Sequence, residues 1–568
     1  MNASVLRTFA LIGFIVFACS PLQSSAQTPS ASTDPVLRAM EDELSRSIQE
    51  LQFKDLEKPY FIQYTILDED RFAADATFGA ITRSERTRER AVQVQVRVGS
   101  YDFDNTEFVL GGGFGGGGNG VLNTTVIDND YDAVRHSLWL ATDVAYKQAV
   151  EQIARKRAFV QNKVQDEKIP DFSKETSVTA VGSKRTLEVD QTKWEKHLRE
   201  WSAIFKNFSE IEQSEVSLSA RMTHRYLVNS EGTRTMQPGF IVSLRAGAAV
   251  QASDGMVLTN SAPFNASAFE LLPPAETITS NIHQLATDLT AVRNAPLLDA
   301  DYSGPVLLIG QASAEMFARV LAPNLSGQRQ PLSDRDQGVV RTELIDRMNR
   351  PVLPRYVTVM DDPTERKAGD KELIGAYHVD DQGVPARRVT LVQDGVLKDL
   401  LMSRRPSKER PQSNGHGRSG LPGRESAQIG NLFIKVVDGK SHDELKKALI
   451  EMCKVENLEY GILVRAVDAD GRGPLGTPVL TYKVYVADGR EELVRGASVN
   501  TLSVRSLRQI EAVGSDSFVA NRLIGAPNAA TPSSVIAPSV LLEEVDLKRP
   551  TMAQQKPALL THPFFKRP

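Results

Sequence analysis

The chain has 568 residues, of which 41% are hydrophobic and 24% are charged. This composition is that of an ordinary globular protein with room for two or three domains. The formal net charge of −4 excludes a chain that is basic throughout, so the composition gives no general preference for nucleic acid.

An export signal is expected at residues 1–26. It contains the apolar run Thr8–Ala18, which is too short to span a membrane and is typical of the core of a signal peptide. Small residues favour cleavage after Ala26 and release into the periplasm or the medium. The alternative is a lipoprotein anchored through Cys19, but Phe17 is large for a lipobox. No later segment is long and apolar enough to cross a bilayer.

The sequence has two cysteines. Cys19 lies in the export signal, and Cys453 lies on a predicted helix. A disulfide within the mature chain is therefore excluded if the signal is cut after Ala26. We expect Cys453 to be a thiol in the hydrophobic core.

Residues 27–210 are expected to form an α/β region. Helical spacing of apolar residues predicts helices that begin near Pro35 and that span Tyr131–Gln161 and Gln191–Phe205. β-Branched, aromatic or alternating residues predict strands at Tyr60–Leu67 and Ala91–Val98. The glycine-rich stretch 111–120 lacks the Lys-Ser/Thr end of a P-loop, so we expect a mobile surface loop there.

Residues 211–300 are expected to form a β-meander and a connecting helix. The predicted strands are Val216–Leu227, Gly239–Leu244 and Ala248–Leu258, separated by turn residues. The helix is Glu276–Arg293, which is amphipathic and leads toward the middle of the chain.

The stretch Gly304–Leu321 is expected to be the centre of the fold. Val306–Ile309 is an apolar run bounded by proline and glycine, which suits a strand covered on both faces. Gly310 then forms a turn, and a helix begins at Gln311 or Ala312. A strand that leads into a helix is a rigid support for catalytic groups.

This stretch and the sequence after it resemble the TldD/PmbA family, also called modulators of DNA gyrase, whose active members are zinc peptidases. In those members the strand leads into H-E-x-x-x-H. In this sequence the first histidine is replaced by Gly310, the glutamate by Gln311 and the second histidine by Glu315. Active members carry a cysteine as the last zinc ligand, and the corresponding stretch Leu523–Pro538 has none.

These replacements remove the chemistry that the family uses. Zinc needs three protein ligands, and Gly310 has no side chain to supply one. Gln311 has a neutral amide that cannot act as a general base. Glu315 alone does not build a zinc site. The resemblance therefore implies a protein without a bound cofactor, in which this helix is a packing element.

The resemblance continues downstream through two strand–turn–strand segments, Tyr356–Thr364 and Gly375–Leu401. They contain the paired carboxylates Asp361-Asp362 and Asp380-Asp381. Each pair lies where a strand ends in a turn, and aspartate is favoured there because its side chain bonds nearby backbone amides. We therefore interpret these residues as turn formers and not as catalytic acids.

Ser413–Arg418, with the sequence SNGHGR, resembles the family's T-G-N-G-R segment beside the cleft. It lies in a loop rich in proline, glycine and arginine that also contains Arg404 and Arg405. Three interpretations are open: a cleft loop that binds peptide, a nucleic-acid patch, and a solvated loop. Export and the lack of interleaved aromatic residues argue against nucleic acid. The motif favours the cleft loop.

The sequence thus predicts an α+β protein with an N-terminal helix-and-sheet domain and a β-rich C-terminal domain of the TldD/PmbA type. The C-terminal domain is expected at residues 301–550, and a disordered tail at 551–568.

The resemblance also suggests a function, because active chains of the family pair with a partner that lacks the metal motif. This chain resembles such a partner: an exported, catalytically inactive subunit of a zinc metallopeptidase that acts on unfolded peptides and binds no nucleic acid. The candidate peptide-cleft residues are Gln311, Glu315, Asn414, His416 and Arg418. Two alternatives remain, an active metallopeptidase with rearranged ligands and a non-enzymatic envelope binding or assembly protein.

Overall fold

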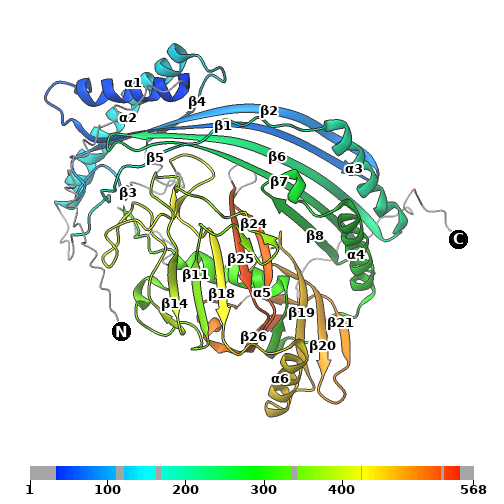
Figure 1. The fold of residues 1–568 in the computed structure, drawn as a ribbon. Coiled ribbons are helices and arrows are strands. Elements are labelled where there is room, and N and C mark those ends of the chain that lie inside the picture. Colours follow the sequence, from blue (N-terminus) through cyan, green and yellow to red (C-terminus); the bar gives the residue numbers. More distant parts are fainter. Residues whose placement is uncertain are drawn as a thin grey trace, which may run out of the picture.

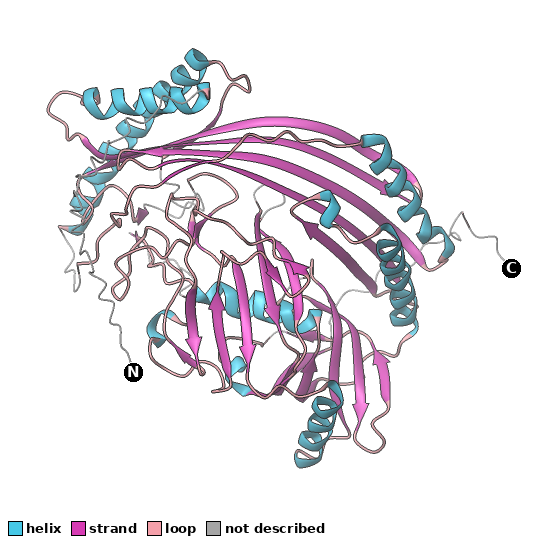
Figure 2. Cartoon of the chain, viewed as in Figure 1, coloured by secondary structure: helices cyan, strands magenta, loops and turns pink. Residues whose placement is uncertain are grey.

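A computed structural model of the chain describes residues 34–109, 120–161, 168–333, 342–423, 425–471, 473–499, 501–525, 530–549 and 564. The expected export signal lies outside these residues, as do the glycine-rich stretch apart from Gly120 and the tail apart from Phe564. Helices and strands alternate in the mixed way expected of an α+β protein (Figure 2).

A long, curved sheet, antiparallel except for the pairing of β5 with β7, spans the N-terminal half of the protein and arches over the C-terminal half (Figure 1). Its order among the described residues is β4-β2-β1-β6-β7-β5, with β8 paired to β7. The strands are β1 Pro59–Thr77, β2 Ala80–Val98, β4 Val121–Thr124, β5 Thr179–Val181, β6 Ile211–Asn229, β7 Arg234–Gln251 and β8 Val257–Ala266. Because β6 pairs with β1 from Gln63 to Ala76, the expected region 27–210 and the expected meander 211–300 share one sheet.

The observed strands are longer than the predicted ones, and β2 and β7 show why. Strand β2 begins at Ala80 and not at Ala91, because arginines in its charged first half pair with aspartates on β1, such as Arg83 with Asp75. Strand β7 runs through Gly247 without a break, because its ladder of hydrogen bonds with β6 continues there. Neither effect depends on apolar spacing, which was the signal used to predict strands.

The helices of this half cover one face of the sheet. They are α1 Pro35–Glu50, α2 Tyr131–Val160, α3 Gln191–Ala203 and α4 Ala275–Asn294, with a 3₁₀ turn, η1, at Ile204–Asn207 after α3. Even-numbered residues of β1 and β6, such as Tyr64 and Leu218, are buried beneath these helices. Successive side chains of a strand point to opposite faces. The odd-numbered residues, such as Arg221, therefore face the C-terminal half.

The two large sheets of the C-terminal half share a hydrophobic core, and two short pairs of strands, β12 Lys367–Ala368 with β13 Lys371–Glu372 and β16 Gly417–Arg418 with β17 Ser426–Ala427, are separate from them. The first has the order β15-β14-β11-β18-β25-β24, with β11 Val357–Asp361, β14 Val389–Gln393, β15 Val396–Leu397, β18 Asn431–Val436, β24 Phe518–Ile524 and β25 Thr531–Ala537. The second has the order β21-β20-β19-β9-β26-β22, with β9 Tyr302–Leu308, β19 Tyr460–Asp468, β20 Thr477–Tyr485, β21 Glu491–Val494, β22 Ser498–Val499 and β26 Val540–Lys548. Strand β23, Ile510–Val513, pairs with β26.

Helix α5, Gln311–Met316, follows β9 and lies within this core, where Ala312, Met316 and Phe317 are fully buried. Helix α6, His442–Val455, covers the outer face of the second sheet and buries Cys453 there, as expected for a core thiol. Short strands β3, Phe108–Val109, and β10, Leu332–Ser333, connect the two halves by parallel pairing. The β-rich C-terminal half and the central position of β9 and α5 confirm the fold predicted from the sequence.

Candidate functional site

The turn from β9 into α5 is the first part of the candidate site. Gly310 adopts φ 53° and ψ −118°, a backbone conformation that residues with a Cβ atom rarely adopt. A Cβ atom built there would find space, because its nearest neighbour, Cδ2 of Phe518, is 3.7 Å away. A histidine at this position would therefore be strained by the backbone and not by crowding.

The amide of Gln311 is bonded to one backbone position of β19. Its Nε2 donates to the Val467 carbonyl at 3.0 Å, and its Oε1 accepts from the Val467 N–H at 3.1 Å. The side chain therefore ties the start of α5 to the second sheet. A glutamate here would keep the acceptor but would set a carboxylate oxygen against the Val467 carbonyl.

Glu315 is buried between two arginines. Its carboxylate pairs with Arg319, one helical turn later at 3.2 Å, and with Arg522 on β24. Arg319 also donates to the carbonyls of Ala469 and Gly471. Through its two arginine partners, the Glu315 carboxylate therefore connects α5 with β24 and with the loop after β19. A carboxylate already shared by two guanidinium groups is a poor ligand for a metal ion.

The zinc ion of the active relatives does not fit these three positions. Gly310 offers no donor atom, the Gln311 amide is engaged by Val467, and Glu315 is engaged by Arg319 and Arg522. Across the part of the chain that the structure describes, no group of three or more His, Cys, Asp or Glu side chains is placed to hold a metal ion. We therefore derive no chemical step through a metal.

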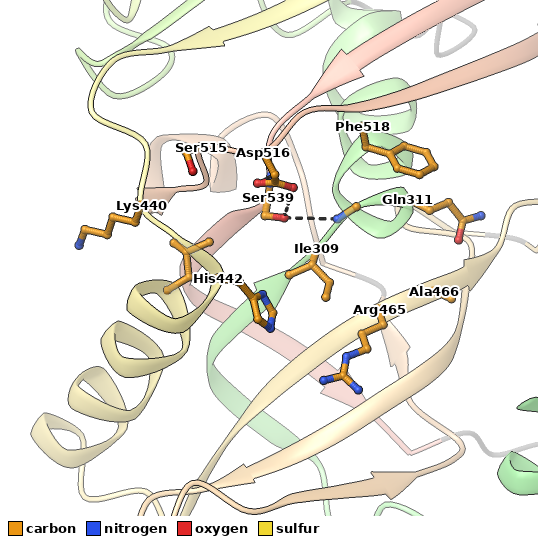
Figure 3. Close-up of a pocket in the computed structure, with 12 residues that line it drawn as sticks. Ile309, Gln311, Lys440, His442, Arg465, Ala466, Ser515, Asp516, Phe518 and Ser539 are labelled. Carbon is orange, nitrogen blue, oxygen red and sulfur yellow. Dashed lines mark hydrogen bonds between the residues drawn. The ribbon is translucent and has the colours of Figure 1, made fainter. Parts of the chain in front are cut away.

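A cavity of about 500 Å³ lies beside the start of α5 (Figure 3). It opens where the parallel strands β9 and β19 end, at Ile309 and Ala466, which is a common place for ligands in sheets with parallel strands. Inside it the Ser539 hydroxyl donates to Asp516 at 2.7 Å and accepts from the Gly310 N–H at 3.3 Å. The cavity therefore combines apolar residues with several polar and basic side chains, among them Lys440, His442 and Arg465.

The second part of the candidate site is the loop that contains Asn414 and His416. The imidazole of His416 is completely buried, with Nε2 3.1 Å from the equally buried carboxylate of Asp361 and Nδ1 3.0 Å from the Asn414 side chain. Asn414 in turn accepts from the Met402 N–H and donates to the Leu400 carbonyl. These contacts fix the loop onto the first sheet.

Arg418 supports the same loop from the other end. Its guanidinium donates to the carbonyls of Ile429 and Pro532 and lies 4.6 Å from the ring of Tyr377. Pro532 is paired with Leu523 in the β24–β25 hairpin, next to Arg522.

The five predicted cleft residues therefore fall into two groups. Each group contacts the β24–β25 pair of strands, Glu315 through Arg522 and Arg418 through Pro532. Among the five residues, only Gln311 lines the cavity. All five bond within the protein, and peptide contact by each of them stays a prediction.

Asp362 and Asp380 accept bonds from backbone amides of their own turns, as expected of turn formers, whereas Asp361 bonds residues far along the chain. Asp380 accepts from the N–H groups of Gln382 and Val384 in its own turn and from Gly417 in the next loop. Asp361 accepts from the Gly430 N–H. No local sequence pattern indicates that these carboxylates also hold segments far along the chain.

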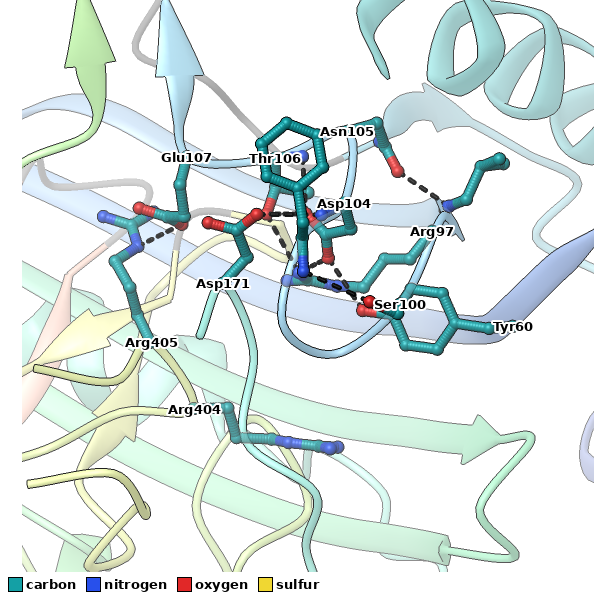
Figure 4. Close-up of polar contacts among 12 residues, drawn as sticks. Tyr60, Arg97, Ser100, Asp104, Asn105, Thr106, Glu107, Asp171, Arg404 and Arg405 are labelled. Carbon is teal, nitrogen blue, oxygen red and sulfur yellow. Dashed lines mark hydrogen bonds and ion pairs between the residues drawn. The ribbon is translucent and has the colours of Figure 1, made fainter. Parts of the chain in front are cut away.

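Two arginines of the same loop, the buried Arg404 and the half-buried Arg405, lie at the junction of the two halves (Figure 4). Arg404 is 1% exposed, donates to the Ser173 carbonyl and pairs with Glu231 at 2.8 Å. Arg405 pairs with the buried Glu107 at 2.6 Å. Because these partners belong to the protein itself, neither arginine is available as part of a nucleic-acid patch.

Phe172 lies between the guanidinium groups of Arg404 and Arg97, which are 3.9 Å and 3.6 Å from its ring centre. Asp171, the residue before Phe172, pairs with Lys156 of α2 at 2.5 Å. Asp104 accepts from Arg97 at 2.7 Å. The segment 168–175 thus joins α2 and the long sheet to the C-terminal half through buried charges.

Sequence reasoning did not identify Ser539, Asp516 or Arg522 as parts of the site. Arg319 had a detectable signal, because it follows Glu315 by four residues, the spacing of an ion pair on a helix. Arg522 is 207 residues from Glu315, and no local pattern connects them.

Known proteins resemble the two halves to different degrees. A family model described as the PmbA/TldA metallopeptidase C-terminal domain matches residues 301–549. A metalloprotease from Methanothermobacter thermautotrophicus is 27% identical over 176 residues, which cover 30% of this chain and 35% of the relative. A metalloprotease from Archaeoglobus fulgidus is 32% identical over 113 residues, covering 20% and 24%. The chain thus spans about a third or less of these curated relatives.

Solved structures match over nearly the whole length. A candidate modulator of DNA gyrase from Thermotoga maritima has a TM-score of 0.57 at 16% identity and covers 89% of this chain and 99% of its own. TldE from Thermococcus kodakarensis has a TM-score of 0.56 at 15% identity and covers 90% and 100%. At these identities the likeness shows the fold, including the arching sheet.

The buried ion pairs of Glu315 predict a loss of stability in Glu315→Gln. The amide keeps the shape but leaves two guanidinium groups without a charged partner, so we expect a loss of about 1–3 kcal/mol in the free energy of unfolding. Denaturant unfolding measures it. Glu451→Gln, which removes an exposed helical pair with Lys454, is the control and should cost under about 1 kcal/mol. Equal losses in both variants would contradict the prediction.

The junction predicts a larger effect in Arg404→Met. Methionine keeps part of the apolar stem but leaves Glu231 buried without its charge partner, which costs about 3–5 kcal/mol in comparable sites. The control is Arg83→Met, whose pair with Asp75 on the sheet surface should contribute about 1 kcal/mol or less. Thermal and denaturant unfolding would show whether the order of these two effects is correct.

Asp380 predicts a dependence of stability on pH. Burial raises the pKa of Asp380 to about 7, although three backbone N–H groups act to lower it. The folded protein therefore holds this proton more tightly than the unfolded chain, in which the pKa is about 4. The contribution of Asp380 to stability is complete below about pH 4 and is lost as the pH rises toward 7.

The test compares wild type with Asp380→Asn, which does not titrate. The difference in unfolding free energy, wild type minus variant, should fall as the pH is raised from about 4 to 7. Asp394→Asn, at an exposed turn, is the control and should follow wild type at every pH. A constant difference for Asp380→Asn would refute the shift.

Proposed function

This chain belongs to the TldD/PmbA family through its C-terminal domain, residues 301–549, and from this premise we propose that it is a metal-free subunit that works beside an active zinc metallopeptidase on unfolded peptides. The observation that carries the proposal is the state of the three family ligand positions. Gly310, Gln311 and Glu315 lack the ligands and the general base, and the latter two are also bonded into the fold.

The rest of the fold is retained. This favours a protein that still works in an assembly over an enzyme that has only lost its activity. The likeness to solved structures extends over 89–90% of this chain, and one of those structures is a TldE. At the position of a family zinc ligand, Glu315 forms ion pairs with Arg319 and Arg522. A helix that had only lost its function would not need two partners from different elements.

The cavity beside α5 gives the proposed subunit a place for a peptide segment. Its volume of about 500 Å³ is in the range of ligand pockets, and its apolar residues Ile309 and Phe518 suit side chains that are exposed only in unfolded chains. Gln311 borders it and is the one predicted cleft residue among those that line the cavity.

We further propose that the subunit acts outside the cytoplasm, in the periplasm or the medium, after removal of residues 1–26, with lipidation at Cys19 as the alternative. This proposal rests on the sequence of the first residues. Within the described residues, no helix combines the length and apolar character needed to cross a membrane.

Metal content and partner dependence test the function together. We expect the purified mature chain, Gln27–Pro568, to carry no stoichiometric zinc and to hydrolyse no unfolded peptide alone, because the ligand positions cannot hold the ion. A co-purified chain that mass spectrometry identifies by an H-E-x-x-x-H motif should supply both zinc and chelator-sensitive hydrolysis. An active metallopeptidase from the family, prepared in parallel, is the control for metal loss.

One zinc per chain, or chelator-sensitive hydrolysis by the isolated chain, would overturn the proposal in favour of an active peptidase with rearranged ligands. Failure to find such a partner, with no peptide binding by the isolated chain, would favour a binding or assembly protein.

A further inference from the structure

Arg465 of β19 lines the cavity beside α5 and leaves most of its hydrogen-bonding capacity unused. Its Nη2 donates to Glu491 at 2.5 Å, and its guanidinium lies 4.6 Å from the centre of the Tyr482 ring. Within the described residues, its Nε and Nη1 donate no hydrogen bond, and 35% of the side chain is exposed. The guanidinium is therefore held in place while most of its five N–H groups remain available to a ligand.

Glu491 does not neutralise this part of the cavity, because two cations share it. The same carboxylate also pairs with Lys446 of α6 at 2.7 Å. Lys446 and Arg465 therefore carry two positive charges against one negative charge. Asp516, an acidic residue of the cavity, accepts from a serine hydroxyl and lies on the opposite side of Ile309 from Arg465 (Figure 3). A positive charge thus remains beside the cavity for an anionic group.

Strand β19 has a bulge at Arg465. The register of β19 with β20 shifts between Val464 and Ala466, so Arg465 has no residue directly opposite it. On the other side of β19, the pairing with β9 ends at Val464. Bulges redirect side chains and are frequent next to binding sites. Figure 3 shows the Arg465 side chain extending toward His442.

His442 adds a hydrogen-bond donor from another element. It is the first residue of α6, whose start is fixed by a capping box between Ser441 and Glu444. The backbone before the helix is also anchored, because the Lys440 N–H donates to the Val513 carbonyl at 2.8 Å. The exposed imidazole of His442 forms no hydrogen bond or ion pair with the described residues. Even a neutral imidazole carries one N–H donor, so His442 can bind the same anionic group as Arg465.

The apolar residues Ile309, Leu445 and Phe518 line the same cavity, so a ligand that fits carries an anion next to an apolar group. Arginine binds a carboxylate through paired, charge-assisted hydrogen bonds. We propose that the cavity recognises a carboxylate of an unfolded peptide, at the C-terminus or on an acidic side chain. Arg465 and His442 bind the carboxylate, and Phe518 contacts the apolar side chain next to it. This inference rests on the proposed function, which makes an unfolded peptide the ligand.

Three versions of one peptide test the recognition with the full mature chain. An unstructured, fluorescent peptide that ends in Leu-Phe is prepared as the free acid, as the C-terminal amide, and as the amide with a glutamate before the leucine. Fluorescence anisotropy measures the three dissociation constants. At least one of the two added carboxylates should tighten binding about tenfold over the plain amide, as expected for charge-assisted hydrogen bonds. The tighter of the two identifies the source of the carboxylate.

Two variants should change this preference in opposite directions. Arg465→Gln removes the guanidinium and should abolish the preference for a carboxylate. Glu491→Gln removes the competing carboxylate and should increase the preference, because Arg465 then loses its charged partner. Lys447→Gln, at an exposed position of α6 outside the cavity, removes the same charge as Arg465→Gln and is the control, which should keep the wild-type preference. Damage to the cavity would weaken all three peptides alike.

The outcomes separate this inference from the proposed function. Equal binding of the three peptides by wild type would overturn carboxylate recognition and leave the proposed peptide role standing. A preference that persists in Arg465→Gln would also overturn it, because the carboxylate would then bind elsewhere. Binding of none of the peptides would overturn this inference together with the peptide role of the isolated subunit.

Discussion

The position of Phe172 between two guanidinium groups is the contact on which the arrangement of the two halves depends. Arg97 belongs to the long sheet and Arg404 to the C-terminal half, so one aromatic ring is shared by both. Charges buried this deeply are costly unless each has a partner, and here Asp104 and Glu231 supply them. The same cost makes any other relative placement of the halves unfavourable.

The candidate site shows the same logic on a smaller scale. Glu315 joins α5 to β24 through Arg522, and Arg319 connects the same carboxylate to the loop after β19. Gln311 replaces a general base by a structural bond to Val467. Gln311 and Glu315 therefore both serve as structural contacts that hold α5 in place. Reversion of one residue would break a contact without restoring a ligand set.

The sequence was informative wherever the structure depends on local pattern. Apolar spacing identified α4 within one residue at each end, and the proline–glycine boundaries of Val306–Ile309 identified β9. It was less informative where distant charges decide the outcome. The first half of β2 has no apolar alternation and becomes a strand because aspartates of β1 lie opposite its arginines. The burial of His416 against Asp361 likewise depends on a contact across 55 residues.

The alternation of faces in the long sheet limits how its sequence can change. Even-numbered residues of β1 and β6 support the helices, and odd-numbered residues such as Arg221 and Arg225 contact the C-terminal half. Insertion or deletion of one residue inside β1 would exchange the two faces beyond that point, whereas a change of two would restore them. Descendants of this gene should therefore differ in the length of these strands by even numbers, with odd changes confined to the turns.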